Sequence, residues 1–281
     1  MESNNLLYHY TDIKAAIGIL KSGVLFFSNF QNLNDREEFI YPDPFVEKTY
    51  EKAKKELIYE KKEIYESNIC EILLKCLGKE FFIFSTTQHD DKYEKNNGSL
   101  IMWRGYGRKC GCAIVFDKNH LELILNKRKS LISGKEWGGF IPGNVHYFDV
   151  EQTQDIENAF GETYNKFLEA LKAHIKKEGA DLLTPYVKIK SLLKHHSFSS
   201  EQEYRLGILR SIESTKNDEQ LIPVKNGRIK IPIVEQGFPI KKIIVSPIGN
   251  QEDNFKKLVS FIQSDPRYHG IEVTKSAIPH I

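Results

Sequence analysis

Residues 6–28 (LLYHYTDIKAAIGILKSGVLFFS) predict the first unit of the fold, which is a strand, a helix and a second strand in succession. Leu6–Thr11 is apolar and aromatic, as is typical of a strand, and Thr11 stands where a helix N-cap belongs. Four apolar residues then recur at the helical period, and Gly23 occupies the expected C-cap position. Val24–Ser28 returns to an apolar run, so we expect a second strand there.

The rest of the chain alternates less regularly between strand and helix patterns. Phe81–Thr87 (FFIFSTT) is the strongest strand, and its first four residues are apolar, so we expect burial on both faces. Further strand patterns occur at 110–116, 145–150, 203–209, 228–233, 240–246 and 271–275, and helical patterns at 44–79, 118–126, 155–177, 181–195 and 251–263. Because strands arrive in clusters, this order favours an α+β fold over a doubly wound one.

Length and composition bound the domain organisation. The chain has 281 residues and 40% apolar content, which is enough to bury a sizeable core. We predict a single domain over residues 1–281, with a helical insertion at about 44–79 and helices at about 155–195. The insertion is dense in Lys and Glu, which is typical of a solvated helix face with i,i+4 pairs.

Charge and cysteine content exclude few partners. The 40 basic and 38 acidic residues leave a net charge of +2, which neither requires nor excludes nucleic acid. The polar N-terminus lacks the apolar core of a signal peptide, and no stretch approaches the roughly 18 apolar residues of a membrane span. We therefore expect a cytoplasmic protein with no membrane partner. The cysteines, expected to be structural rather than zinc ligands, are Cys70, Cys76, Cys110 and Cys112.

Three short polar segments each follow or precede an apolar run. They are Tyr8-His9-Tyr10-Thr11, Ser85-Thr86-Thr87 and Glu201-Gln202-Glu203-Tyr204-Arg205. Each would place hydrogen-bonding side chains at a strand edge, where a cleft can form. Taken alone, each also has a plain alternative: a core histidine, a strand end, and a surface strand with an ion pair. Their combination and order carry the functional argument.

The third segment puts two carboxylates two residues apart. If the stretch is extended, Glu201 and Glu203 share one face and repel each other. Such a pair needs a cation between its members or a proton on one of them. A cationic, oxocarbenium-like transition state would be one such partner, and glycosyl-transfer enzymes use carboxylates in this way.

Two further segments suggest metal ligands but lack a full ligand set. They are His89-Asp90-Asp91 and His195-His196, which we expect to be a loop and a helix end.

The order of the three polar segments resembles the ADP-ribosyltransferase superfamily, with His on a first strand, Ser/Thr on a second and E-x-E late in the chain. The opening is similar to the bacterial DarT-type and RNA 2′-phosphotransferase-type branches. In these, H-Y/F-T at a strand end precedes a helix with I-L-x-x-G. Here the two patterns are matched by His9-Tyr10-Thr11 and by Ile19-Leu20-Lys21-Ser22-Gly23.

Nearly the full length also resembles a bacterial domain family of unknown function. Its pattern runs Y-H-Y-T, I-L-x-S-G-x-L, L-N-D-x-x-E, F-S, M-W-x-x-Y-G, E-x-E-Y-R and I-x-x-S-P. The additional matches here are Leu33-Asn34-Asp35 with Glu38, Met102-Trp103 with Tyr106-Gly107, and Ile243 with Ser246-Pro247.

The superfamily resemblance implies a split β-sheet core with flanking helices, with NAD as co-substrate. His9 would then bind a ribose of NAD, with Tyr10 or Thr11 on the nicotinamide side. Ser85 or Thr86 would brace the site. Glu203 would be the catalytic residue, and Glu201 would face the incoming nucleophile as a general base or an orienting group.

Other residues have a binding role and a structural one that compete. Trp103 and Tyr106 would stack on adenine or nicotinamide, or pack in the core. Asn34, Asp35 and Glu38 would line the cleft or form an Asx turn. Candidate diphosphate partners are Arg104, Arg108 and Arg205.

The resemblance implies transfer of ADP-ribose to a macromolecular acceptor, protein or nucleic acid, in a bacterial toxin or anti-phage effector. NAD hydrolysis and an RNA 2′-phosphotransferase-like reaction are the alternatives within the fold. A non-catalytic module that binds a nucleotide or nucleic acid is the alternative outside it. The first glutamate of E-x-E often accompanies an arginine acceptor, but that branch usually carries Arg on its first strand, so the acceptor stays open, as does the oligomeric state.

Overall fold

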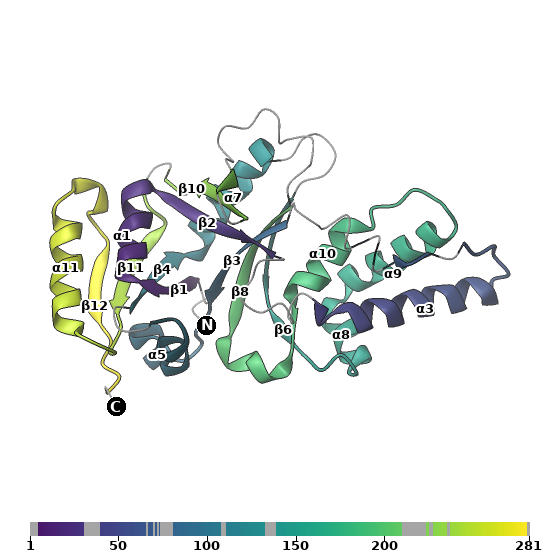
Figure 1. Ribbon diagram of the computed structural model, residues 1–281, viewed down its shortest axis with the longest axis horizontal. Helices are drawn as coiled ribbons and strands as arrows, with labels where there is room; N and C mark the ends of the chain where they lie inside the picture. The colour runs from purple at the N-terminus through teal and green to yellow at the C-terminus, as the bar shows by residue number, and fades with distance from the viewer. Residues whose placement is uncertain are drawn as a thin grey trace.

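The computed structural model describes residues 5–30, 40–65, 67–69, 71, 73, 81–107, 111–132, 139–209, 223–224, 227–234 and 237–279. These residues form a mixed fold of helices around an open, largely antiparallel sheet (Figure 1). The strands are β1 (Leu6–Asp12), β2 (Val24–Asn29), β3 (Phe81–Thr87), β4 (Gly111–Asp117), β5 (Gly139–Asn144), β6 (His146–Tyr147), β7 (Leu193–Lys194), β8 (Glu203–Leu209), β9 (Pro223–Val224), β10 (Arg228–Pro232), β11 (Ile240–Val245) and β12 (Glu272–Lys275).

The helices flank this sheet. They are α1 (Ile13–Ser22), α3 (Asp43–Tyr59), α5 (Lys92–Asn97), α6 (Leu100–Met102), α7 (Lys118–Ile132), α8 (Thr153–Phe160), α9 (Glu162–Ile175), α10 (Leu183–Leu192) and α11 (Gln251–Gln263). Shorter helical turns are the π segment η2 (Trp103–Gly107) and the 3₁₀ segments η3 (His196–Glu201) and η6 (Pro266–Tyr268). Within the described residues, no helix has both the length and the apolar character that crossing a membrane requires.

The opening strand, helix and strand form as predicted, with one correction at the helix start. The N-cap is Asp12 and not Thr11, because Asp12 Oδ1 accepts the Ala15 N–H at 2.7 Å. Thr11 stays in β1, where it pairs with Cys112 of β4. Gly23 ends the helix at φ 63°, a left-handed conformation that glycine adopts without strain. The main chain then turns directly into β2.

The pairing of β3 creates a gap in the sheet. One edge of β3 pairs with β8 along its whole length. On its other edge, β1 meets it only at Tyr8↔Thr87 and β2 only at Ser28↔Ile83 and Asn29↔Phe82. β1 continues instead along β4. Among the described residues, no strand pairs with this edge of β3 between Ile83 and Thr87. Polar residues of β3 border the resulting gap between β1 and β2.

Two large cores lie on opposite faces of β3, with a third at one end of the sheet. Phe82 and Phe84 point into a core shared with α1, α7 and α11, whereas Phe81 and Ile83 point into a core shared with α3, α8, α9 and α10. This alternation follows from the two-residue period of a strand and confirms the expected burial of β3 on both faces. Figure 1 shows the second group of helices as a lobe beside the sheet. The third core contains Trp103 with residues of β1 and β4.

Several helices lie close to where the pattern predicted them, and several short elements were not predicted. α3 (Asp43–Tyr59) covers the first part of the predicted helical stretch 44–79, and α8, α9 and α10 lie at 153–192, close to the predicted helices at about 155–195. His89–Asp91 form the expected loop, but the short helix α5 after it was not predicted; Asp91 caps this helix by accepting the Tyr93 and Glu94 N–H groups. β5 (GFIPGN) also escaped prediction, because its glycines and proline do not resemble a strand.

The described cysteine also agrees with the expected structural role. Cys112 is buried within β4, and burial raises the pKa of its thiol. The other three cysteines lie outside the described residues.

Candidate active site

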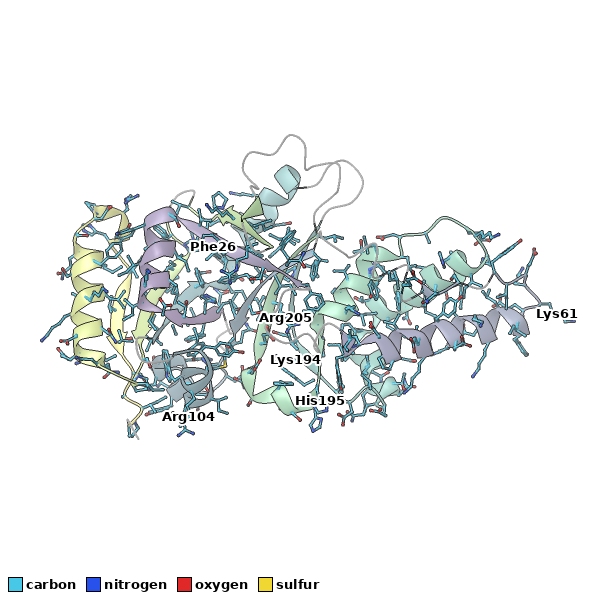
Figure 2. All side chains as sticks on the ribbon, in the orientation of Figure 1. Phe26, Lys61, Arg104, Lys194, His195 and Arg205 are labelled. Atoms are coloured by element: carbon cyan, nitrogen blue, oxygen red, sulfur yellow. The ribbon has the colours of Figure 1, made fainter. Side chains whose placement is uncertain are left out.

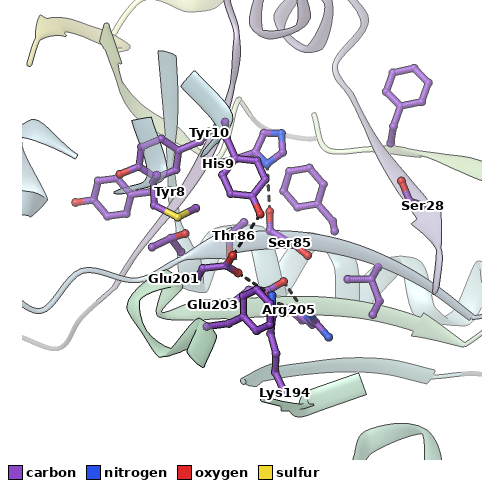
Figure 3. Close-up of a pocket in the computed structure, with 17 residues that line it drawn as sticks. Tyr8, His9, Tyr10, Ser28, Ser85, Thr86, Lys194, Glu201, Glu203 and Arg205 are labelled. Atoms are coloured by element: carbon purple, nitrogen blue, oxygen red, sulfur yellow. Dashed lines mark hydrogen bonds and ion pairs between the residues drawn. The ribbon is translucent and has the colours of Figure 1, made fainter. Parts of the chain in front are cut away.

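The three polar segments of the sequence meet at the gap beside β3. A cavity of about 420 Å³ lies there, lined by side chains from β1, β2, β3, η2, η3 and β8 (Figure 3). That volume falls within the range of small-molecule sites. Of the site residues proposed from sequence, those lining the cavity are His9, Tyr10, Ser85, Thr86, Tyr106, Glu201, Glu203 and Arg205. They lie far apart in the sequence, so the pairing of β1 and β8 with β3 brings them together.

His9 is held as a neutral hydrogen-bond acceptor. Its Nδ1 lies 3.1 Å from the Ser85 carbonyl oxygen, on the edge of β3 that faces the gap. A carbonyl only accepts, so Nδ1 carries the proton and Nε2 keeps its lone pair. Burial lowers the pKa of His9 to about 4, although the bond to Ser85 opposes this shift. The ring also packs on Phe84, with centroids 4.4 Å apart.

Glu203 is a buried carboxylate that stays ionised. Its side chain is 8% exposed, and it accepts hydrogen bonds from Arg205 Nε and Nη2, both at 2.8 Å. Burial by itself would raise the pKa of Glu203. The charge and hydrogen bonds of Arg205, with contributions from Lys194 and the Ser85 hydroxyl, outweigh burial and bring it to about 2. The carboxylate is therefore charged and fixed in place before any ligand arrives.

Arg205 serves this carboxylate rather than an external anion. Its guanidinium is almost fully buried, and besides Glu203 it bonds the Ser191 carbonyl oxygen through Nη1 at 2.7 Å. The expectation that Arg205 binds a diphosphate is therefore wrong for this arrangement.

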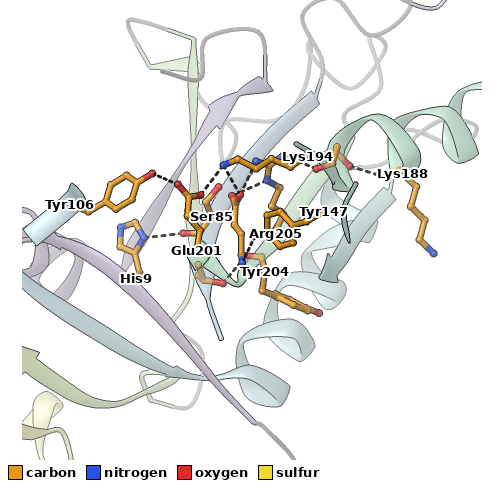
Figure 4. Close-up of polar contacts among 12 residues, drawn as sticks. His9, Ser85, Tyr106, Tyr147, Lys188, Lys194, Glu201, Tyr204 and Arg205 are labelled. Atoms are coloured by element: carbon orange, nitrogen blue, oxygen red, sulfur yellow. Dashed lines mark hydrogen bonds and ion pairs between the residues drawn. The ribbon is translucent and has the colours of Figure 1, made fainter. Parts of the chain in front are cut away.

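The cation that the E-x-E pair requires is Lys194. Its Nζ lies 2.7 Å from Glu201 Oε2 and 3.5 Å from Glu203 Oε2, and its side chain is 4% exposed (Figure 4). The stretch is not extended, however, because Glu201 ends η3 and Gln202 adopts φ 45°. The carboxylates converge through that turn and not through a shared strand face. A lysine between them offsets their repulsion.

Lys194 and Tyr147 belong to the site but were not singled out from the sequence. They stand opposite each other in the parallel pair β6–β7. The Tyr147 hydroxyl accepts the Glu203 N–H at 2.7 Å. The one signal in the sequence was that Lys194 directly follows two leucines (SLLKHH), which indicates a buried position. A buried lysine is almost always paired with a carboxylate, so a nearby acidic partner could have been expected.

Tyr10 and Thr86 form the walls of the cavity. The Tyr10 hydroxyl accepts the Ser99 N–H at 2.8 Å and shares a second hydrogen bond with His89 Nε2 at 2.7 Å. Thr86 Oγ1 donates to the Tyr204 carbonyl at 2.7 Å. Tyr106 stands at the mouth, where its hydroxyl reaches Glu201 Oε1 at 3.5 Å.

Some predicted ligand residues lie elsewhere. Trp103 is fully buried, its indole N–H donates to the Asn97 carbonyl at 2.9 Å, and its ring meets Tyr10 edge-on. It therefore packs in the third core and is not exposed for stacking on a ligand. Thr11 is not among the cavity residues. Arg104 is exposed on the surface (Figure 2), and the remaining candidates, Asn34, Asp35, Glu38 and Arg108, lie outside the described residues.

Comparison with known proteins supports the family resemblance for part of the chain. Residues 102–206 match the model of a family described as "Protein of unknown function (DUF2971)". The matched region includes Tyr106, Lys194 and the whole E-x-E segment. The resemblance to a family of unknown function is thus confirmed. No curated protein and no solved structure matches the chain.

Proposed function

We propose that the chain is an NAD-dependent ADP-ribosyltransferase that modifies a macromolecular acceptor. The observation that carries this proposal is the convergence of His9, Ser85 and Glu203, from three separate strands, on one cavity. The gap between β1 and β2 along β3 is also consistent with the split sheet of that superfamily. The order of the motifs along the chain supports the same assignment.

In this proposal the reacting centre is the nicotinamide ribose. The bond from ribose C1′ to the nicotinamide nitrogen breaks, its electron pair leaves with neutral nicotinamide, and the sugar becomes oxocarbenium-like. Glu203 accepts a hydrogen bond from the ribose 2′-OH and stabilises the positive charge as it develops. Because Arg205 already orients this carboxylate, little reorganisation accompanies the reaction, which favours the transition state over the ground state.

His9 would hold a ribose hydroxyl in place. Its Nε2 is the acceptor left by the bond from Nδ1 to Ser85. A neutral ring also avoids repelling the positively charged nicotinamide of NAD. The pKa of about 4 keeps His9 neutral throughout the physiological range.

Glu201 would receive the acceptor. Its carboxylate lies at the cavity mouth, between Lys194 and Tyr106, and is more exposed than that of Glu203. The acceptor atom would form the new bond to C1′ and give its proton to Glu201. Lys194 allows two carboxylates to occupy the same cavity.

The cations of the cavity argue against phosphate chemistry at the reacting centre. Among the described lining residues these are Lys194 and Arg205, and both are engaged with glutamates. A transferring phosphate needs cationic partners, whereas an oxocarbenium ion needs a carboxylate. The arrangement therefore favours ribose chemistry over an RNA 2′-phosphotransferase-like reaction.

The test is nicotinamide release from NAD by the wild type and by Glu203→Gln, with cell lysate as the source of acceptors. We expect the variant to lose about 100-fold or more of the rate. Glu252→Gln is the matched control, because Glu252 lies on α11 in an exposed pair with Lys275. Undiminished release by Glu203→Gln would refute the proposal, and release without a mass increase on any acceptor would indicate hydrolysis.

A second variant guards against misfolding. Glu203→Gln leaves the Arg205 charge buried without its partner, so thermal unfolding should be compared alongside. Ser85→Ala removes one hydrogen bond to Glu203 without unpairing a charge. We expect about a tenfold loss of rate in this variant, with a melting temperature near that of the wild type. A folded Ser85→Ala protein with full activity would argue against the bracing role of Ser85.

A further inference from the structure

A second cluster of ligand-bearing side chains lies beside the cavity but outside it. Asp149 Oδ1 is 3.1 Å from His195 Nε2 and 2.9 Å from His196 Nδ1. One ligand atom from each residue lies within 4.8 Å of the others. The sequence left His195-His196 without a full ligand set, and the fold supplies a carboxylate from a distant segment. His195 lies next to Lys194 at the edge of the helical lobe (Figure 2).

The parallel pair β6–β7 explains why these residues meet. Its register places His146 opposite Leu193 and Tyr147 opposite Lys194. The Phe148 N–H then donates to the Lys194 carbonyl at 3.1 Å, so the two segments continue side by side. The next residues on the two segments are Asp149 and the histidine pair, so the backbone itself directs the ligands toward one point.

The surroundings orient the cluster and leave one side open. The Tyr41 ring meets His195 edge-on, and its hydroxyl donates to the Phe148 carbonyl at 2.7 Å. Such supporting contacts orient ligands in metal sites. The side chains of Asp149, His195 and His196 are between 38% and 59% exposed, so water can complete a coordination shell.

We propose that Asp149, His195 and His196 bind a divalent transition-metal ion, with Zn²⁺ as the best fit. Two imidazole nitrogens and one carboxylate oxygen suit Zn²⁺, whereas Mg²⁺ and Ca²⁺ favour oxygen ligands. Bonds of about 2.0–2.2 Å in a tetrahedral shell place ligand atoms roughly 3.3–3.6 Å apart. The two separations from Asp149 Oδ1, 3.1 and 2.9 Å, therefore need to widen by roughly 0.2–0.7 Å, and the ligand atoms of the two histidines already lie within 4.8 Å of each other.

Binding requires two ring protons to move, because His195 Nε2 and His196 Nδ1 both face the Asp149 carboxylate, which only accepts, and each nitrogen must present a lone pair to the metal. His195 Nδ1 accepts the Ser197 N–H at 3.2 Å, so Nε2 now carries the ring proton and donates it to Asp149. Coordination at Nε2 transfers this proton to Nδ1 and breaks the contact with Ser197. The lost contact is long and at the surface, so its cost is small beside that of a metal bond.

The ion would clamp the two segments that support the E-x-E pair. Asp149 follows Tyr147, which bonds the Glu203 N–H, and His195 follows Lys194, which binds Glu201. The metal would hold this framework and take no part in the reaction. The metal-site proposal does not depend on the proposed ADP-ribosyltransferase activity. An experiment can therefore refute one of the two proposals and leave the other standing.

The experiment uses the full chain, stripped with a chelator and titrated with Zn²⁺ by calorimetry and with Co²⁺ by visible absorption. We expect one equivalent to bind, with affinity reduced more than about tenfold in Asp149→Ala, His195→Ala and His196→Ala. Zn²⁺ should also raise the melting temperature of the wild type and not of these variants. His269→Ala is the control, because His269 is an exposed histidine near the single carboxylate of Asp265.

Two results would overturn this proposal. One is the absence of stoichiometric binding by the wild type. The other is binding that survives unchanged in all three variants, which would place the ion elsewhere. The variants change exposed side chains, so their metal-free melting temperatures should match that of the wild type within a few degrees.

Discussion

Two buried lysines, four residues apart, serve the two halves of this molecule differently. Lys190 lies in the core of the helical lobe, where its ammonium pairs with Asp43 at the start of α3. Lys194 lies at the cavity wall, where it contacts two glutamates. The first pair ties one helix to another and closes a core. The second holds two like charges together beside a cavity large enough for a ligand. Buried charge gathered at a cavity is typical of functional sites, so this contrast supports the cavity as the candidate site.

Removing Arg205 should have the largest effect, because it breaks the pairing on which the cavity depends. Arg205→Ala leaves the buried Glu203 carboxylate without its principal cation. We expect a loss of about 3–5 kcal/mol in the free energy of unfolding, together with loss of NAD cleavage. Urea unfolding measures the first, and Arg228→Ala, an exposed arginine on β10, is the control. A loss below about 1 kcal/mol would show that Glu203 is stabilised by other groups.

Removing Lys190 should separate stability from activity. Lys190→Ala unpairs Asp43 in the helical lobe, and we expect a loss of about 3 kcal/mol with the activity of the folded protein retained. The control is Lys166→Ala, whose ion pair with Glu162 is fully exposed, so the free energy of unfolding should stay near that of the wild type. Denaturant unfolding and nicotinamide release measured on the same samples test this contrast. Lost activity in folded Lys190→Ala would mean that the two halves are coupled.

The protonation of His9 should appear as a pH dependence of stability. Its pKa is about 4 in the folded state, against about 6.5 when unfolded, so the unfolded state binds the proton first as pH falls. Stability should therefore fall between pH 7 and 5, by about 1–2 kcal/mol because the ring retains some solvent contact. His9→Gln should lack this part of the slope. Glu203 adds little in this window, because its stabilisation is lost only below the unfolded pKa of about 4.5.

Replacing Lys194 should have the smallest energetic effect and a distinct signature. In Lys194→Met the cation between Glu201 and Glu203 is lost while Arg205 still binds Glu203, so the less well paired carboxylate, Glu201, should take up a proton at higher pH. We expect about a tenfold loss of nicotinamide release at pH 7, and an acid limb of the pH profile that moves to higher pH. Lys190→Met should leave the profile unchanged. An unshifted profile in Lys194→Met would assign Lys194 a packing role.

Much of the fold followed from local patterns. β1, α1, β2, β3, β8 and α11 lie where periodicity predicted them, because burial of one or both faces imposes a period of two or 3.6 residues on the sequence. The elements that were missed have weak periodicity. α5 depends on a single capping aspartate, and β5 on pairing with β8.

The site was predicted in its residues more than in its geometry. His9, Ser85, Glu201 and Glu203 were named from their residue types and order. Their ionisation states, the turn at Gln202, the cation Lys194 and the contact of Asp149 with His195 and His196 were not predicted. For Trp103 the residue type was misleading. A tryptophan suits stacking on a ligand, but the structure buries this side chain in the third core.

The sequence by itself determined the type of the strongly periodic elements and which short segments carry reactive groups. Tertiary structure alone decided which of those groups meet, which cation neutralises the glutamates, and which aromatic ring is sealed in the core. The physical reason is that hydrophobic period and capping act over a few residues along one segment. Pairing between strand edges joins residues that are far apart in the chain, and one register among many sets the distances between them.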